Sequence, residues 1–140
     1  METNPGARKR PFPFPKATWA LLAVYFVASL VHFAHNAEFI AFYPNMPTWL
    51  TRENVYLAWL AVTSVGVAGV VAARFGLGAL GALLLGAYGA LGLDGLQHYT
   101  LALCSEHTLA ANVTIWFEAA TGLLLAVVSV LQVNIHLEKA

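Results

Sequence analysis

The stretch ATWALLAVYFVASLVHFAHNAEFIAF, residues 17–42, contains one charged side chain, Glu38. Three further apolar runs follow it, at residues 55–73, 77–103 and 109–135. Each run reaches or approaches the roughly 20 residues that an α-helix needs to cross about 30 Å of hydrocarbon. The four runs therefore predict an all-α membrane protein with four transmembrane helices.

The composition agrees with this fold class. Hydrophobic residues make up 59% and charged residues 10% of the 140-residue chain, and the mean hydropathy is +0.69. A soluble domain has a charged fraction nearer about 25%. We expect a basic, proline-rich tail at residues 1–16 and a single domain at 17–140, with helices at about 17–43, 51–73, 77–103 and 108–135. The short connections predict an antiparallel, up-down-up-down bundle.

The basic residues predict the orientation of this bundle. Six of the seven fall on one predicted side, and only Arg52 falls on the other. The six are Arg8, Lys9, Arg10, Lys16, Arg74 and Lys139. Basic residues accumulate on the cytoplasmic side of membrane proteins. We therefore expect a bacterial inner-membrane protein with both termini in the cytoplasm and with its first and third loops outside.

Ionisable side chains recur within three of the four apolar runs. They are His32, His35, Glu38, Asp94, His98 and Glu118. At 1.5 Å per residue, these groups lie roughly 8 to 18 Å below the outer ends of their predicted helices. Ionisable groups are costly inside a bilayer, and they usually face the interior of a helix bundle or a water cavity. The sequence therefore predicts a buried polar site in the outer half of the bundle.

The spacing of these groups favours a metal site. His32 and His35, like His35 and Glu38, are i, i+3 neighbours on a helix, and Asp94 and His98 are i, i+4 neighbours. Imidazoles combined with carboxylates suit zinc, copper or iron. We predict a transition-metal site whose ligands come from these five residues.

A metal-dependent function follows as the first hypothesis. A bound metal would activate oxygen or water, and Glu118 and Asp94 would move protons. The protein would then be an enzyme with oxidative or hydrolytic chemistry. A protein that handles a metal ion without catalysis fits the same residues.

Three other interpretations stay open. The first is a metal-free acid/base or proton-transfer site. The second is a haem protein with His32 or His35 and His98 as axial ligands. The third is a structural accessory subunit of a membrane complex. Glu106 and His107, in the third loop, are either solvated polar residues or a lid over the site. The expected partners are the lipid bilayer and either further copies of the chain or a larger membrane complex, with no nucleic acid.

The third apolar run is rich in glycine. Gly86, Gly89, Gly92 and Gly95 recur at every third residue. Small residues at a helix surface allow close packing of helices in lipid, so we expect a tightly packed third helix. Gly92 and Gly95 also flank Asp94, and a second interpretation is a kink or local unwinding toward the polar site.

Overall fold

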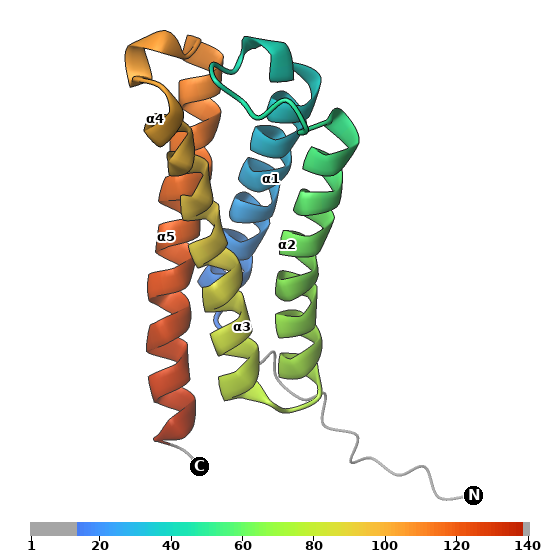
Figure 1. Ribbon diagram of the computed structural model, residues 1–140. Helices are drawn as coiled ribbons and strands as arrows, with labels where there is room; N and C mark the ends of the chain where they lie inside the picture. The colour runs from blue at the N-terminus through green and yellow to red at the C-terminus, as the bar shows by residue number, and fades with distance from the viewer. Residues whose placement is uncertain (1–13, 139–140) are drawn as a thin grey trace, which may run out of the picture.

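The computed structural model describes residues 14–138, and over that range the protein is entirely helical (Figure 1). Within this range, four segments are long and apolar enough to cross a membrane: Lys16–Glu38, Arg52–Arg74, Gly78–Leu101 and Leu109–Leu137. The prediction of four apolar spans is therefore confirmed. Arg8, Lys9, Arg10 and Lys139, which contribute to the predicted orientation, lie outside the described residues.

Each long helix begins and ends at a local signal. The elements are α1 (Lys16–Glu38), η1 (Ile40–Phe42), α2 (Arg52–Arg74), α3 (Gly78–Leu91), η2 (Gly92–Gln97), α4 (His98–Leu101), η3 (Cys104–Glu106) and α5 (Leu109–Leu137). The side chains of Thr51 and Thr108 accept backbone hydrogen bonds at the starts of α2 and α5, as N-cap residues do. Gly76, with φ of 89°, makes the turn between α2 and α3.

The first helix is shorter than predicted. It ends at Glu38 rather than near residue 43, and a 3-10 turn, η1, follows it. The backbone of Tyr43 is extended, as expected for a residue that precedes proline, here Pro44.

The third span is not one continuous α-helix. The α-helix α3 gives way at Gly92 to the 3-10 turn η2, and the short helix α4 then completes the span. Two glycines allow this turn to press against its neighbours. A Cβ atom on Gly92 would lie 2.7 Å from the ring of Tyr25, and one on Gly95 would lie 3.3 Å from the Glu118 carboxylate. The α-helix is therefore interrupted around Asp94, by a tighter turn and not by the unwinding that was expected.

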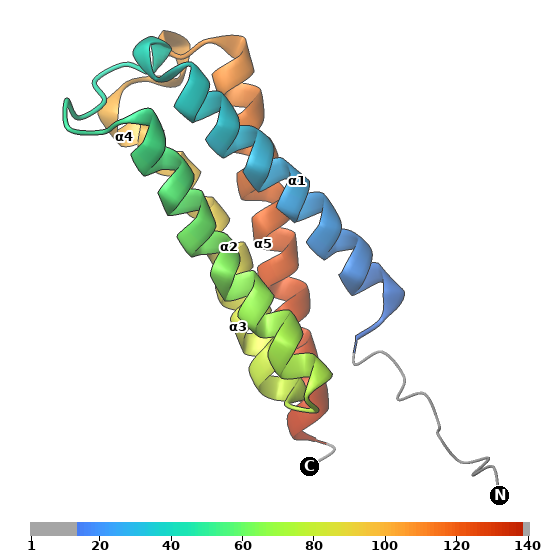
Figure 2. The same cartoon turned by 90° about the vertical axis from the view of Figure 1, so that its right-hand side faces the viewer.

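Close packing of the glycine-rich helix is also present. Helix α3 packs along both α5 and α2, and α1 packs along α5 and α2. At the contact between α3 and α5, a Cβ atom on Gly89 would lie 2.6 Å from the carbonyl oxygen of Gly122. Figure 2 shows that α1 leans away from the other helices toward its N-terminal end. The bundle is thus tight between α3 and α5 and looser beside the first half of α1.

The elements η1, α4 and η3 lie at the same end of the bundle (Figure 1). We call this the loop end and define it by residues 39–51 and 98–108. Tyr43 from the first connection packs there against Ala111 and Ile115 of α5 in one buried cluster. The first connection is therefore held against the helix that carries Glu118.

The contact between Gly89 and Gly122 makes a stability prediction. We expect Gly89→Ala to lower the free energy of unfolding in detergent by about 1–3 kcal/mol, because the added methyl meets backbone, which cannot move aside. Gly86→Ala is the matched control, since its Cβ would lie 3.3 Å from the Cβ atom of Ser129. Thermal unfolding of both variants tests this, and equal midpoints would contradict it.

Candidate functional site

Seven polar side chains, each less than a tenth exposed, come together between α1, α4, α5 and the connections at the loop end. We call this group the polar core. Its members are His32, Asn36, Tyr43, His98, His107, Thr114 and Glu118. Several of them lie within segments long and apolar enough to span a membrane, and inside a membrane water is not available to solvate polar atoms. Their contacts with one another therefore determine what the site can do.

His32 and Glu118 form the centre of the polar core. Nε2 of His32 lies 3.6 Å from Oε2 of Glu118, and these side chains are 4% and 1% exposed. On its other side, Nδ1 of His32 lies 3.3 Å from the hydroxyl oxygen of Thr114, which donates its own hydrogen to the carbonyl of Ala111. A hydroxyl has one hydrogen to donate, so while Thr114 donates to Ala111, Nδ1 of His32 is the donor to Thr114.

This arrangement fixes the protonation pattern of the ring. With its Nδ1 hydrogen directed to Thr114, a neutral His32 presents the Nε2 lone pair to Glu118. Two acceptors that face each other repel unless a positive charge lies between them. The space between His32 and Glu118 therefore suits a proton or a cation.

The other surroundings of Glu118 leave it incompletely hydrogen-bonded. Its Oε1 atom has no hydrogen-bond partner among the described residues, and the hydroxyl of Ser29 is buried close by without an ordinary hydrogen bond. The backbone of Gly95 covers the remaining side, where a Cβ atom would lie 3.3 Å from Oε2 and 3.5 Å from Nε2 of His32. The absence of a side chain at Gly95 thus keeps space open beside Oε2 of Glu118 and Nε2 of His32.

The polar core continues from His32 to the loop end. The rings of His32 and His98 have centroids 5.6 Å apart, and Nδ2 of Asn36 lies 3.3 Å from Nε2 of His98. The ring of Tyr43 packs on His98 at 4.9 Å, and the ring of His107 lies 6.1 Å from that of His98. Aromatic and imidazole rings thus connect the buried carboxylate with the connections outside the spans.

Tyr43 is the member of this series that reaches a more accessible group. Its hydroxyl lies 2.8 Å from Nδ1 of His35, which is half-buried. Burial raises the pKa of Tyr43 to about 12, so the phenol stays neutral at ordinary pH. A neutral phenol both donates and accepts a hydrogen bond, as a group that passes protons must.

Only some of the predicted metal ligands come together. His32 and His98 are adjacent in the polar core, whereas His35 lies at its edge. Glu38 is exposed at the end of α1, where it pairs with Arg52 at 2.8 Å and accepts a hydrogen bond from Tyr56. Within residues 14–138 there is no group of three or more histidine, cysteine, aspartate or glutamate side chains arranged to hold a metal ion.

Asp94 also lies apart from the polar core, although its spacing from His98 suggested a shared face. It is exposed and accepts a hydrogen bond from Gln97. The 3-10 turn explains the difference. Residues four apart are about 40° apart around an α-helix but about 120° apart at three residues per turn, so Asp94 and His98 point in different directions.

Four members of the polar core were not predicted as site residues from sequence: Asn36, Tyr43, His107 and Thr114. Thr114 precedes Glu118 by four residues, and this helical spacing was the signal that could have identified it. His107 was expected to be solvated or to form a lid, but it is 7% exposed and its Nδ1 donates a hydrogen bond to the carbonyl of Leu103. Tyr43 lies in a connection and carries no such pattern.

No protein-family model, curated protein or solved structure matches this chain. A function can therefore be argued only from the residues and contacts described above.

The raised pKa of Tyr43 predicts a specific loss of stability in alkali. The Tyr43 phenol loses its proton near pH 10 in the unfolded protein and near pH 12 in the folded protein. Its contribution to the free energy of unfolding is therefore complete below pH 10 and falls as the pH rises to 12. Its size is on the order of 2 kcal/mol. We expect the thermal midpoint to fall less steeply over this pH range in Tyr43→Phe than in wild type. Parallel pH profiles would contradict the assignment.

Proposed function

We propose that this protein is a membrane-embedded acid/base protein in which Glu118 and His32 take up and release a proton. The observation that carries the proposal is the buried carboxylate oxygen facing the imidazole nitrogen at 3.6 Å. A carboxyl group inside a membrane span must be protonated, paired or bound to a cation. Because His32 directs its Nδ1 hydrogen to Thr114, one additional proton on either Nε2 or the carboxyl group would relieve the repulsion.

The rest of the polar core would connect this pair with the aqueous phase. His98 lies beside His32, and Tyr43 lies between His98 and the half-buried His35. Histidine is the side chain best suited to exchange protons near neutral pH. A proton would pass between Glu118 and the loop end through these rings after small side-chain rotations. The same exchange serves acid/base catalysis or proton transfer along the bundle.

We further propose that the four spans run antiparallel and that the loop end faces away from the cytoplasm. Lys16 and Arg74 lie at the ends of their helices remote from the loop end, whereas Arg52 lies at the loop end. An excess of basic residues at one end is typical of the cytoplasmic side. In the proposed orientation both termini lie in the cytoplasm, as in a bacterial inner-membrane protein, and the polar core exchanges protons with the outside.

Infrared difference spectroscopy of the protein in liposomes tests the acid/base proposal. We expect a carboxyl C=O band that changes with pH, shifts on deuterium exchange and is absent in Glu118→Gln. Asp94→Asn is the matched control, because it removes an exposed carboxylate outside the polar core and should retain the band. His32→Gln should move the pH at which the band changes, since it removes the proton partner. Identical spectra for wild type and Glu118→Gln would refute the proposal.

A metal ion at the same place is the second candidate, and one distance favours it. Two ligands at about 2.1 Å from one tetrahedral ion are about 3.4 Å apart, close to the 3.6 Å between His32 Nε2 and Glu118 Oε2. His98 would be the third ligand after its ring rotates away from Asn36, and Gly95 leaves room for the ion. Zinc, copper or iron would suit these donors. Such a site would support oxidative or hydrolytic chemistry or metal handling.

Elemental analysis distinguishes the two candidates. If the metal proposal holds, the purified protein carries a stoichiometric metal that the double variant His32→Ala, His98→Ala loses. His136→Ala is the control, because His136 lies near the opposite end of α5 and contacts the carbonyl of Gln132. An optical Soret band would instead identify haem. Metal retained by the double variant, or absent from wild type after metals are supplied, would rule out a metal site in the polar core.

A further inference from the structure

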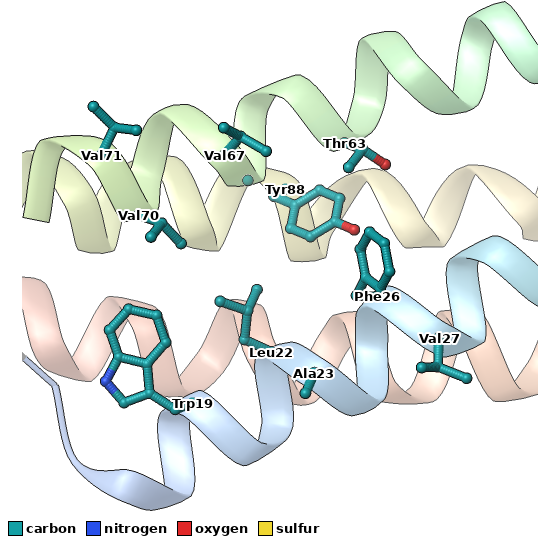
Figure 3. Close-up of a pocket in the computed structure, with 11 residues that line it drawn as sticks. Trp19, Leu22, Ala23, Phe26, Val27, Thr63, Val67, Val70, Val71 and Tyr88 are labelled. Carbon is teal, nitrogen blue, oxygen red and sulfur yellow. The ribbon is translucent and has the colours of Figure 1, made fainter.

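A second feature lies between α1 and α2, and Glu118 is not among the residues that line it. It is a cavity of about 450 Å³, within the range typical of ligand pockets. Figure 3 shows its lining side chains, which come from α1, α2 and α3. Those used below are Trp19, Ala23, Phe26, Val27, Thr63 and Tyr88. The cavity occupies the region where α1 leans away from α2 (Figure 2).

The position of this cavity determines what fills it. All of its lining residues belong to candidate membrane spans, and nearly all are apolar. An apolar cavity does not hold ordered water, because water there would find too few hydrogen-bond partners. Along α1 it extends from Trp19 to Val27, a length of about 12 Å. The occupant that matches this shape and surface is a single hydrocarbon chain taken from the bilayer.

Two polar atoms interrupt the apolar lining at one end of the cavity. The hydroxyl oxygens of Tyr88 and Thr63 are both buried and lie close to each other, but neither makes a hydrogen bond of ordinary geometry to a described residue. Figure 3 shows them at the same end, near Phe26. Tyr88 is 1% exposed, and its ring is held by Tyr25 and by Gly66, where a Cβ atom would lie 2.6 Å from it. An unpaired buried hydroxyl costs about 1–3 kcal/mol, which an oxygen atom of a ligand would recover.

The depth of these hydroxyls narrows the class of ligand. Tyr88 lies ten residues after the start of α3 at Gly78, which is about 15 Å along the helix and near the middle of a hydrocarbon core about 30 Å thick. The ester oxygens of a phospholipid lie at the membrane interface and do not reach this depth. A neutral lipid with one chain and a single small oxygen-bearing head does reach it.

We propose that the cavity binds a neutral single-chain lipid with a hydroxyl or carbonyl head, its chain along Trp19 and its oxygen at Tyr88 and Thr63. Val27, at the same end, precedes His32 by five residues, or about 7.5 Å along α1. The head of the lipid would therefore face the polar core. The proposal that this lipid is a substrate rests on the proposed acid/base function. The proposal that the lipid binds here rests on the cavity alone.

Quenching of Trp19 fluorescence tests the binding site in liposomes. The protein retains Trp19 alone through Trp49→Phe, Trp59→Phe and Trp116→Phe, and the probes are dibrominated octadecanol and dibrominated phosphatidylcholine at equal bromine content. We expect quenching by the alcohol to saturate and to exceed quenching by the phospholipid. Quenching that rises in proportion to bromine and is equal for both lipids would overturn the proposal.

Three variants of the protein that retains Trp19 alone test whether the alcohol occupies the cavity and whether it bonds to the hydroxyl of Tyr88. Ala23→Phe fills the cavity and should abolish saturable quenching. Ala68→Phe adds the same bulk at an exposed position on α2 outside the cavity, so it should leave the quenching unchanged. Tyr88→Phe should weaken alcohol binding about three- to tenfold, the value of one hydrogen bond, and leave binding of a dibrominated octadecane unaltered. Equal effects of the two alanine variants would also overturn the proposal.

Glu118→Gln separates this inference from the acid/base function. Because Glu118 does not line the cavity, the variant should bind the alcohol like wild type even though it lacks the titrating carboxyl band. If the alcohol fails to bind while the band still titrates, the lipid site is refuted and the acid/base function is not. If the alcohol binds but wild type has no titrating band, the acid/base function fails and the binding site stands.

Discussion

The carboxyl group of Glu118 lies within a segment long and apolar enough to span a membrane, and its burial constrains the elements around it. A charged or polar group facing lipid costs several kcal/mol, so the helices must enclose it. Three segments do so: α1 contributes His32, α5 itself contributes Thr114, and η2 contributes the backbone of Gly95. The arrangement of the bundle near the loop end follows from this enclosure.

The glycines of the third span make the enclosure possible. Gly89 and Gly122 bring α3 and α5 into backbone contact, and Gly92 accepts the ring of Tyr25. Because η2 winds more tightly than an α-helix, its backbone reaches the space beside Glu118 while Asp94 is turned outward. The packing between α3 and α5 is tight, whereas the packing between α1 and α2 is looser. There α1 leans away (Figure 2), and the cavity lies between the two helices.

Two tyrosines connect α1 and α3, and one of them, Tyr88, lines the cavity. Tyr25 donates a hydrogen bond to the backbone carbonyl of Tyr88, and the two rings meet edge to face. The pair holds α1 against α3. A proton and a metal ion are competing occupants of the space between His32 and Glu118, and both rely on the same tautomer of His32. The acceptor that favours this tautomer is the hydroxyl oxygen of Thr114, so a residue without charge influences the chemistry of two that can carry it.

The sequence by itself determined the helical class, the four apolar spans and the presence of ionisable groups at similar depths. These properties depend on local length, hydrophobicity and hydrogen bonding, which are visible in consecutive residues. Only the tertiary structure decided which groups meet. His32, Glu118 and His98 converge, whereas Asp94 and Glu38 do not, because a six-residue 3-10 turn changes the direction of side chains and the early end of α1 leaves Glu38 beside Arg52. Tyr43 and His107 joined the site through connections whose path depends on packing between helices distant in the chain, and no periodic pattern records such a path.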